Sequence, residues 1–185
     1  NKGNLFYSRR IGRVGDKPRR YWDIGKQIGS DETIFKNPEQ IKLINATKIS
    51  GRTQKGLGIG ILNAITNNQY AIIENKSSKE KRKIETEPLT NYNVLVLDQT
   101  LKYNSSISFV NTNVLRNGEA KDANVSALLF DLNNKKNTLN VGGNISISSL
   151  GAMNNKIETG YAHSLYFGKT SGRFNFRFYQ DLYGA

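Results

Sequence analysis

The residues of this chain that could perform chemistry are few and scattered. His163 is the single histidine, and cysteine is absent, so a metal site built on imidazole or thiolate ligands is not expected. A serine nucleophile with His163 as its base would need an aligned third partner, which the sequence does not indicate. Glu85, Glu87 and Asp98 could act as an acid–base pair, but nothing in the sequence places them in a cleft. We therefore expect no enzymatic activity, no catalytic residue and no cofactor.

Glycines at positions 56, 58 and 60 resemble a phosphate-binding loop at first sight. Such a loop requires a strand before it and a helix after it. Here Leu57, Ile59 and Ile61 stand between and after the glycines, and they continue a strand pattern. Small residues on a crowded sheet face explain these glycines better than phosphate binding does.

The elements that would position any site are β-strands with a distinctive polar face. In residues 138–148, aliphatic residues such as Leu139, Val141, Ile145 and Ile147 alternate with Gly, Ser, Thr and Asn. A period of two places these two sets on opposite faces. Soluble sheets usually cover the outer face with long charged side chains, whereas a membrane barrel turns its apolar face to lipid and its polar face to the lumen. The pattern predicts an outer-membrane β-barrel.

Strand patterns recur along the whole chain. The predicted strands are residues 5–12, 41–53, 57–67, 89–101, 106–115, 123–132, 138–148, 157–167 and 173–183. The connections alternate between short (54–56, 102–105, 133–137, 168–172) and generally longer, polar segments (14–40, 68–88, 116–122, 149–156). Short turns on one side and longer loops on the other are typical of outer-membrane barrels. The best short helical candidate is 37–43.

The predicted fold is all-β: an antiparallel up-and-down transmembrane β-barrel segment of about eight or nine meandering strands. We interpret residues 1–185 as a single barrel region, with a short first strand and a long polar loop in 1–40 and four β-hairpins in 41–185. An odd number of strands would leave an unpaired edge in hydrocarbon, which is costly. We therefore expect the chain to be part of a larger barrel.

Charged residues on the polar faces of the predicted strands are the best functional candidates. The candidate lumen-facing charges are Lys48, Arg52, Asp98, Arg173, Arg177 and Asp181. Charges inside a barrel can tune which solutes pass. They can equally form an internal salt-bridge network that only fastens the wall, and the sequence leaves both roles open.

Composition sets further limits on function. The formal net charge is +12, with basic clusters at residues 9–20 and 76–83. We do not expect nucleic-acid binding, because neither a recognition helix nor an aromatic stacking platform accompanies the charge. No apolar run is long enough for a transmembrane helix. Residues 94–97 and 127–130 are apolar on both faces, so a soluble β-barrel or β-sandwich that binds a ligand remains the alternative.

Several motifs also resemble a known family. They lie in residues 5–13, 46–53, 58–66 and 87–92, in that order, and the most distinctive includes Tyr7, Arg9, Arg10 and Arg13. The chain resembles the uncharacterised Gram-negative outer-membrane proteins that carry an N-terminal family-9-like carbohydrate-binding domain followed by a β-barrel region.

The resemblance implies an internal part of the barrel region, located in the cell outer membrane of a Gram-negative bacterium. It implies a pore or surface scaffold associated with glycan binding or uptake. Outer-membrane lipid would be its partner, with polysaccharide or other outer-membrane subunits as further partners. It implies no catalytic residues and assigns no role to Tyr7, Arg9, Arg10 or Arg13.

Overall fold

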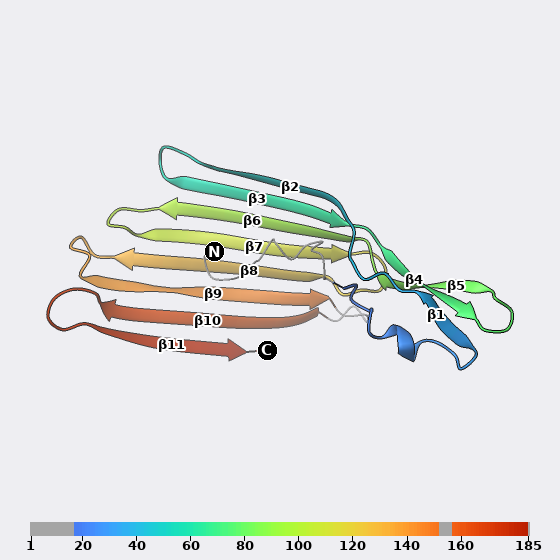
Figure 1. Cartoon of the computed structure of the whole chain (residues 1–185). Helices are drawn as coiled ribbons and strands as arrows, with labels where there is room; N and C mark the ends of the chain where they lie inside the picture. Colours follow the sequence, from blue (N-terminus) through green and yellow to red (C-terminus); the bar gives the residue numbers. More distant parts are fainter. Residues whose placement is uncertain (1–16, 152–156, 185) are drawn as a thin grey trace.

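Alternating aliphatic and small polar residues build one large antiparallel sheet (Figure 1). The computed structural model describes residues 17–151 and 157–184. The strands of this sheet are β2 (Leu43–Arg52), β3 (Leu57–Thr66), β6 (Thr90–Thr100), β7 (Ser106–Arg116), β8 (Ala123–Asn133), β9 (Leu139–Gly151), β10 (Ile157–Lys169) and β11 (Phe176–Gly184). They are ordered β2-β3-β6-β7-β8-β9-β10-β11, each hydrogen-bonded to its neighbours.

The predicted antiparallel up-and-down arrangement is confirmed, but the sheet is open. Its order ends at β2 and β11, which do not pair with each other in the part of the chain that the structure describes. No closed barrel is therefore formed by these residues. The predicted strand at 5–12, with Tyr7, Arg9 and Arg10, and the nearby Arg13 lie outside the described residues.

The predicted bounds of the eight long strands agree with the structure to within three residues. The helical candidate at 37–43 is wrong, because residues 37–42 are irregular and Leu43 begins β2. Among the described residues no helix is long and apolar enough to cross a membrane.

A second, three-stranded sheet was predicted only as loops. It consists of β1 (Glu32–Lys36), β4 (Gln69–Asn75) and β5 (Lys81–Glu87) in the order β1-β4-β5, and it lies beyond one end of the large sheet (Figure 1). Its core is formed by Ala71 and Ile73 of β4, packed with Ile24 of the short 3-10 helix η3 (Ile24–Lys26). These strands are short and rich in charge, so their pairing depends on a tertiary core that local patterns do not show.

The two faces of the large sheet differ in the size and exposure of their side chains. Residues directly opposite each other in an antiparallel pair share a face, and the register joins Ile59, Leu97, Phe109, Leu128 and Ile145 in one row. Of these, Ile145 is 48% exposed and Ile59 is 40% exposed. The buried residues of this sheet lie instead on the opposite face and include Ala64, Val94, Ser108, Val110, Ala127 and Asn140. We call these the apolar face and the polar face.

We predict that β1 loosens from the small sheet at acidic pH. Arg82 donates from Nε and Nη2 to Oε1 and Oε2 of Glu32 at 2.6 and 2.7 Å, and the amide of Gly29 donates to the same carboxylate at 2.8 Å. These hydrogen bonds, led by those from Arg82, lower the pKa of Glu32 from 4.5 to about 2. A depressed carboxyl pKa contributes stability that is complete above the unfolded value and is lost as pH falls through the folded one.

The protection factors of the β1 amides, which are exchange rates corrected for the intrinsic rate at each pH, should therefore fall between pH 4.5 and pH 2, and the carboxyl carbon of Glu32 should titrate in NMR with a midpoint near 2. In a Glu32→Gln variant, these protection factors should be low already at pH 6 and should not change in this interval. A Glu32 midpoint near 4.5 would contradict the pairing.

Candidate functional site

Five of the six predicted lumen-facing charges lie on the polar face, but only Arg52 and Asp98 are in contact, since Arg52 on β2 and Asp181 on β11 stand at opposite edges of the sheet. Register joins Arg52, Asp98 and Asp181 in a single row that crosses the sheet through Ser108 and Asn144. Lys48 and Arg177 lie on the same face, each four residues along its strand from this row and on opposite sides of it. Arg173 does not lie on a strand. It belongs to the connection before β11, which begins only at Phe176, so its predicted place on a strand is wrong.

Arg52 and Asp98 form an ion pair across β3. Nη2 of Arg52 donates to Oδ2 of Asp98 at 2.5 Å, and the Ser108 hydroxyl donates to Oδ1 at 2.6 Å. Nη1 of Arg52 also donates to Oγ1 of Thr100 at 2.7 Å. The Asp98 side chain is 13% exposed and that of Arg52 is 49% exposed. The intervening residue of β3 is Gly58, which leaves the space that the guanidinium fills.

A second carboxylate, Asp131 of β8, organises the polar face near the β8–β9 turn. It accepts a hydrogen bond from the Tyr166 hydroxyl at 2.6 Å and bonds from the amides of Asn140 and Asn133 at 2.9 and 3.0 Å. The guanidinium of Arg177 lies 5.2 Å from the centre of the Tyr166 ring. Asp131 was not among the predicted site residues, because the apolar run just before it obscures the two-residue period. A lone acidic residue inside a predicted strand was the available signal.

Gly142 makes room for this second cluster. A Cβ atom there would stand 2.3 Å from the Tyr166 hydroxyl oxygen and 2.7 Å from the carbonyl oxygen of Phe130. Asp131, Gly142 and Tyr166 are direct neighbours across three strands. The tyrosine ring therefore crosses the glycine to reach the carboxylate. A shallow pocket of about 370 Å³ lies here, lined by Ser106, Ser108, Asp131, Asn144, Ser164 and Tyr166 among others.

A row of short polar side chains, which was not predicted, crosses the apolar face near the small sheet, and Ile65, Leu115 and Ile157 lie beyond it on the same face. The register aligns Thr47, Asn63, Asn93, Asn113, Asn124, Ser149 and Thr159. We call this the asparagine row. Nδ2 of Asn63 donates to Oδ1 of Asn93 at 2.8 Å, so the row is in part hydrogen-bonded internally. Each asparagine alone looks like an irregularity, and only the pairing of strands shows that they form a line.

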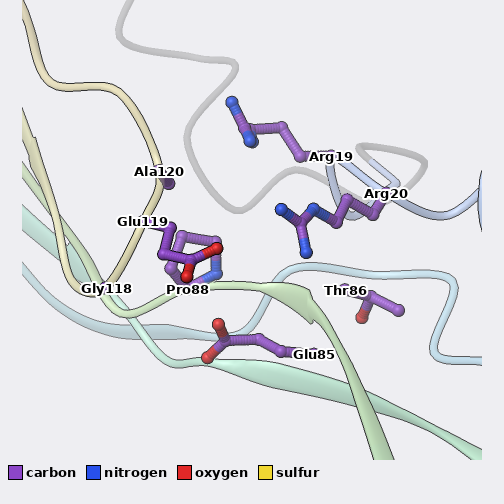
Figure 2. Close-up of a pocket in the computed structure, with 8 residues that line it drawn as sticks. All are labelled: Arg19, Arg20, Glu85, Thr86, Pro88, Gly118, Glu119 and Ala120. Carbon is purple, nitrogen blue, oxygen red and sulfur yellow. The ribbon is translucent and has the colours of Figure 1, made fainter. Parts of the chain in front are cut away.

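A separate pocket of about 200 Å³ lies where the segment before η3 meets the end of β5 and the β7–β8 connection. Figure 2 shows Arg19 and Arg20 on one side of it and the carboxylates of Glu85 and Glu119 on the other. The amide of Arg19 donates to Oε2 of Glu87 at 2.6 Å. Glu87 is only 2% exposed, and its burial raises the pKa of its carboxyl. Because two arginines face two glutamates, the lining carries no excess charge, and we interpret this pocket as a structural junction.

The arrangement offers no catalytic constellation among the described residues. Glu85 and Glu87 lie at the end of β5, whereas Asp98 is eight residues into β6, about 26 Å away along the strand. His163 lies on the apolar face between Ile145 and Leu182. Gly56 lies in a turn with φ of 84°, and β3 follows it directly instead of a helix. No group of three or more potential metal ligands occurs in the described ranges.

Comparison with known proteins gives one match. The family model described as "Domain of unknown function (DUF5916)" matches residues 1–184. No curated protein and no solved structure matches the chain.

We predict that Tyr166→Phe lowers the free energy of unfolding by about 1.5–3 kcal/mol, because a hydrogen bond to an ionised carboxylate is lost. The ring over Gly142 is kept, so the loss reports the hydroxyl alone. Urea unfolding followed by circular dichroism measures the change. Tyr179→Phe is the matched control, since its hydroxyl receives only a 3.3 Å bond from Arg177 at an exposed site. Equal losses in both variants would contradict the role of Asp131.

We predict that Gly142→Ala also destabilises the sheet, by about 1–3 kcal/mol, because the added methyl group displaces the Tyr166 ring and strains the backbone of β8. The matched control is Gly51→Ala in β2, where an added Cβ has no neighbour within 4 Å. That control should be neutral or slightly stabilising. If the same unfolding assay gives equal changes for both glycines, the packing of Tyr166 on Gly142 is not as described.

Proposed function

The chain belongs to the DUF5916 family, and from its geometry we propose that it forms part of the wall of an outer-membrane β-barrel in a Gram-negative bacterium. Its proposed partner is outer-membrane lipid, which would cover the apolar face. The barrel would serve as a pore or a surface scaffold. Association with polysaccharide or with other outer-membrane subunits belongs to the same proposal and is supported by the family resemblance of the sequence.

The observation that carries this proposal is the exposure of large aliphatic and aromatic side chains over one whole face. Ile61 is 49% exposed, Ile147 is 60% exposed and Phe178 is 67% exposed. Removing a side chain of this kind from water is worth about 1.5–3 kcal/mol. A contiguous apolar surface of this extent is not stable in water without a cover. Lipid hydrocarbon would provide that cover for each strand in turn.

The length of the apolar surface supports the same proposal. Along β9 the aliphatic residues run from Leu139 to Ile147, and Ser149 of the asparagine row follows. Nine residues rise about 26 Å, and a transmembrane strand needs about 9–11 residues. The apolar run of β9 is therefore about as long as a transmembrane strand requires, and the polar Ser149 follows it.

The contacts of the polar face support the proposal that this face is the water-filled inner side of a barrel wall, where polar side chains pair with one another. Arg52 is paired with Asp98, and Asp131 accepts three hydrogen bonds from neutral side chains. Because Arg52, Asp98 and Asp131 have these partners, we favour a role for them in holding the strands of the sheet together. Lys48 and Asp181 have no such described partner and remain the better candidates for contact with a solute.

The alternative is a soluble β-barrel or β-sandwich in which the apolar face is covered by protein. The open edges at β2 and β11 allow it, because further strands could fold over the same face. In that case protein would cover the apolar face, and added lipid would reach its residues no better than it reaches those of the polar face.

Depth-dependent fluorescence quenching distinguishes the two proposals. In a Trp22→Phe background, which removes the only native tryptophan, we expect Ile145→Trp and Ile61→Trp to be strongly quenched by brominated lipid acyl chains. Asn144→Trp is the matched control, since it neighbours Ile145 on β9 but faces the opposite side. It should be quenched weakly. Equal quenching at 144 and 145, or a folded protein that needs no detergent, would contradict the membrane proposal.

A further inference from the structure

A cleft of about 480 Å³ lies where the small sheet meets the ends of β2 and β3. Three lysines line it: Lys36 from β1, Lys83 from β5 and Lys42 from the residue before β2. Tyr70 and Ile72 of β4 provide an apolar wall beside them. Residues distant in the sequence therefore supply one concentrated patch of positive charge.

The fold itself places these lysines together. The register pairs Lys36 with Ile72 and Ile72 with Lys83, so the two lysines flank one isoleucine on the same face of the small sheet. Lys42 is held at the adjoining edge, because its carbonyl oxygen accepts a hydrogen bond from the amide of Asn67 at 2.8 Å. The cleft is thus built by backbone pairing, and the lysine side chains are free to turn toward a ligand.

The positive charge of the cleft is not neutralised within the described part of the chain. No carboxylate there lies within 4 Å of Lys36, Lys42 or Lys83, although other lysines are paired. Lys79 and Lys81, for example, lie 3.7 and 3.4 Å from Glu74. The described lining holds one acidic residue, Glu39, whose Oε1 accepts a hydrogen bond from the Tyr21 hydroxyl at 3.2 Å. An excess of two positive charges in a cleft is a site for an anion.

The position of the cleft identifies the anion, and this step rests on the proposed function. The asparagine row crosses the apolar face at Asn63, and Asn67 in the cleft follows four residues later, about 13 Å along the extended chain. With the usual tilt of barrel strands this is a height of about 10 Å, which places the cleft at the outer margin of a headgroup layer that is about 5–8 Å thick on each side of the core. We propose that Lys36, Lys42 and Lys83 bind the phosphate of an anionic lipid headgroup, with Tyr70 and Ile72 as the apolar wall beside it.

Native mass spectrometry of the full chain, released from nanodiscs, tests this proposal. The discs contain phosphatidylcholine with one fifth phosphatidylglycerol. We expect the wild type to retain phosphatidylglycerol selectively. The triple variant Lys36→Gln, Lys42→Gln, Lys83→Gln should bind it about a hundredfold more weakly, because each lysine near an anionic surface contributes about 1 kcal/mol. Circular dichroism verifies that the variant is folded.

The matched control removes the same charge from the short-turn end of the sheet, through Lys55→Gln, Lys102→Gln and Lys135→Gln. It should retain phosphatidylglycerol as the wild type does. Equal retention by both triple variants, or equal loss from both, would overturn the cleft as the site. If inorganic phosphate at low millimolar concentration displaces the lipid, the ligand is free phosphate and the headgroup assignment is overturned.

Failure of this proposal is distinguishable from failure of the barrel proposal. Quenching of Ile145→Trp by brominated acyl chains reports insertion whether or not any headgroup is bound. Strong quenching without selective retention of phosphatidylglycerol would reject the lysine cleft alone. Absence of quenching would reject the membrane wall, and with it the headgroup as ligand.

Discussion

The register of the antiparallel backbone ladder is the constraint on which the rest of the structure depends. Because side chains alternate with a period of two, a shift of one residue in any pair would exchange the two faces of that strand. The observed register keeps Ile59, Leu97, Phe109, Leu128 and Ile145 on one face from β3 to β9. The same register brings Arg52 to Asp98 and Tyr166 to Asp131 on the other face. Face separation and polar pairing are thus two results of one pattern of hydrogen bonds.

The small sheet is an extension of the β3–β6 pair. β3 ends at Thr66 and β4 begins at Gln69, while β5 ends at Glu87 and β6 begins at Thr90. The chain thus forms one long hairpin that bends where Asn67–Asn68 and Pro88–Leu89 interrupt the ladder. Proline has no amide hydrogen to donate, which suits it to this interruption. Thr66, Thr86 and Thr90 are fully buried at the bend, and the Thr90 hydroxyl donates to the carbonyl of Pro88 at 3.0 Å.

The pairing of charged side chains differs between the polar face of the large sheet and the cleft beside the small sheet. On the polar face, Arg52 and Asp98 compensate each other, because a carboxylate with little exposure is costly without a partner. In the small sheet, Glu32 is held by Arg82, yet Lys36, Lys42 and Lys83 remain unpaired around one cleft. A cluster of three lysines without a described carboxylate partner therefore lies beyond the asparagine row. In a bilayer this is the level at which lipid phosphates would meet it.

The sequence alone determined the eight long strands, their antiparallel order and the division into an aliphatic and a small polar face. Local alternation and turn composition are sufficient for these features, because both act within about ten residues. The tertiary structure decided what depends on pairing between distant strands: the sheet of β1, β4 and β5, the contact of Tyr166 with Asp131 over Gly142, the asparagine row and the lysine cleft. Each of these brings together residues from different strands, so no single segment carries its signal. The place of Arg173 in a connection likewise followed from where β11 begins in its pairing with β10.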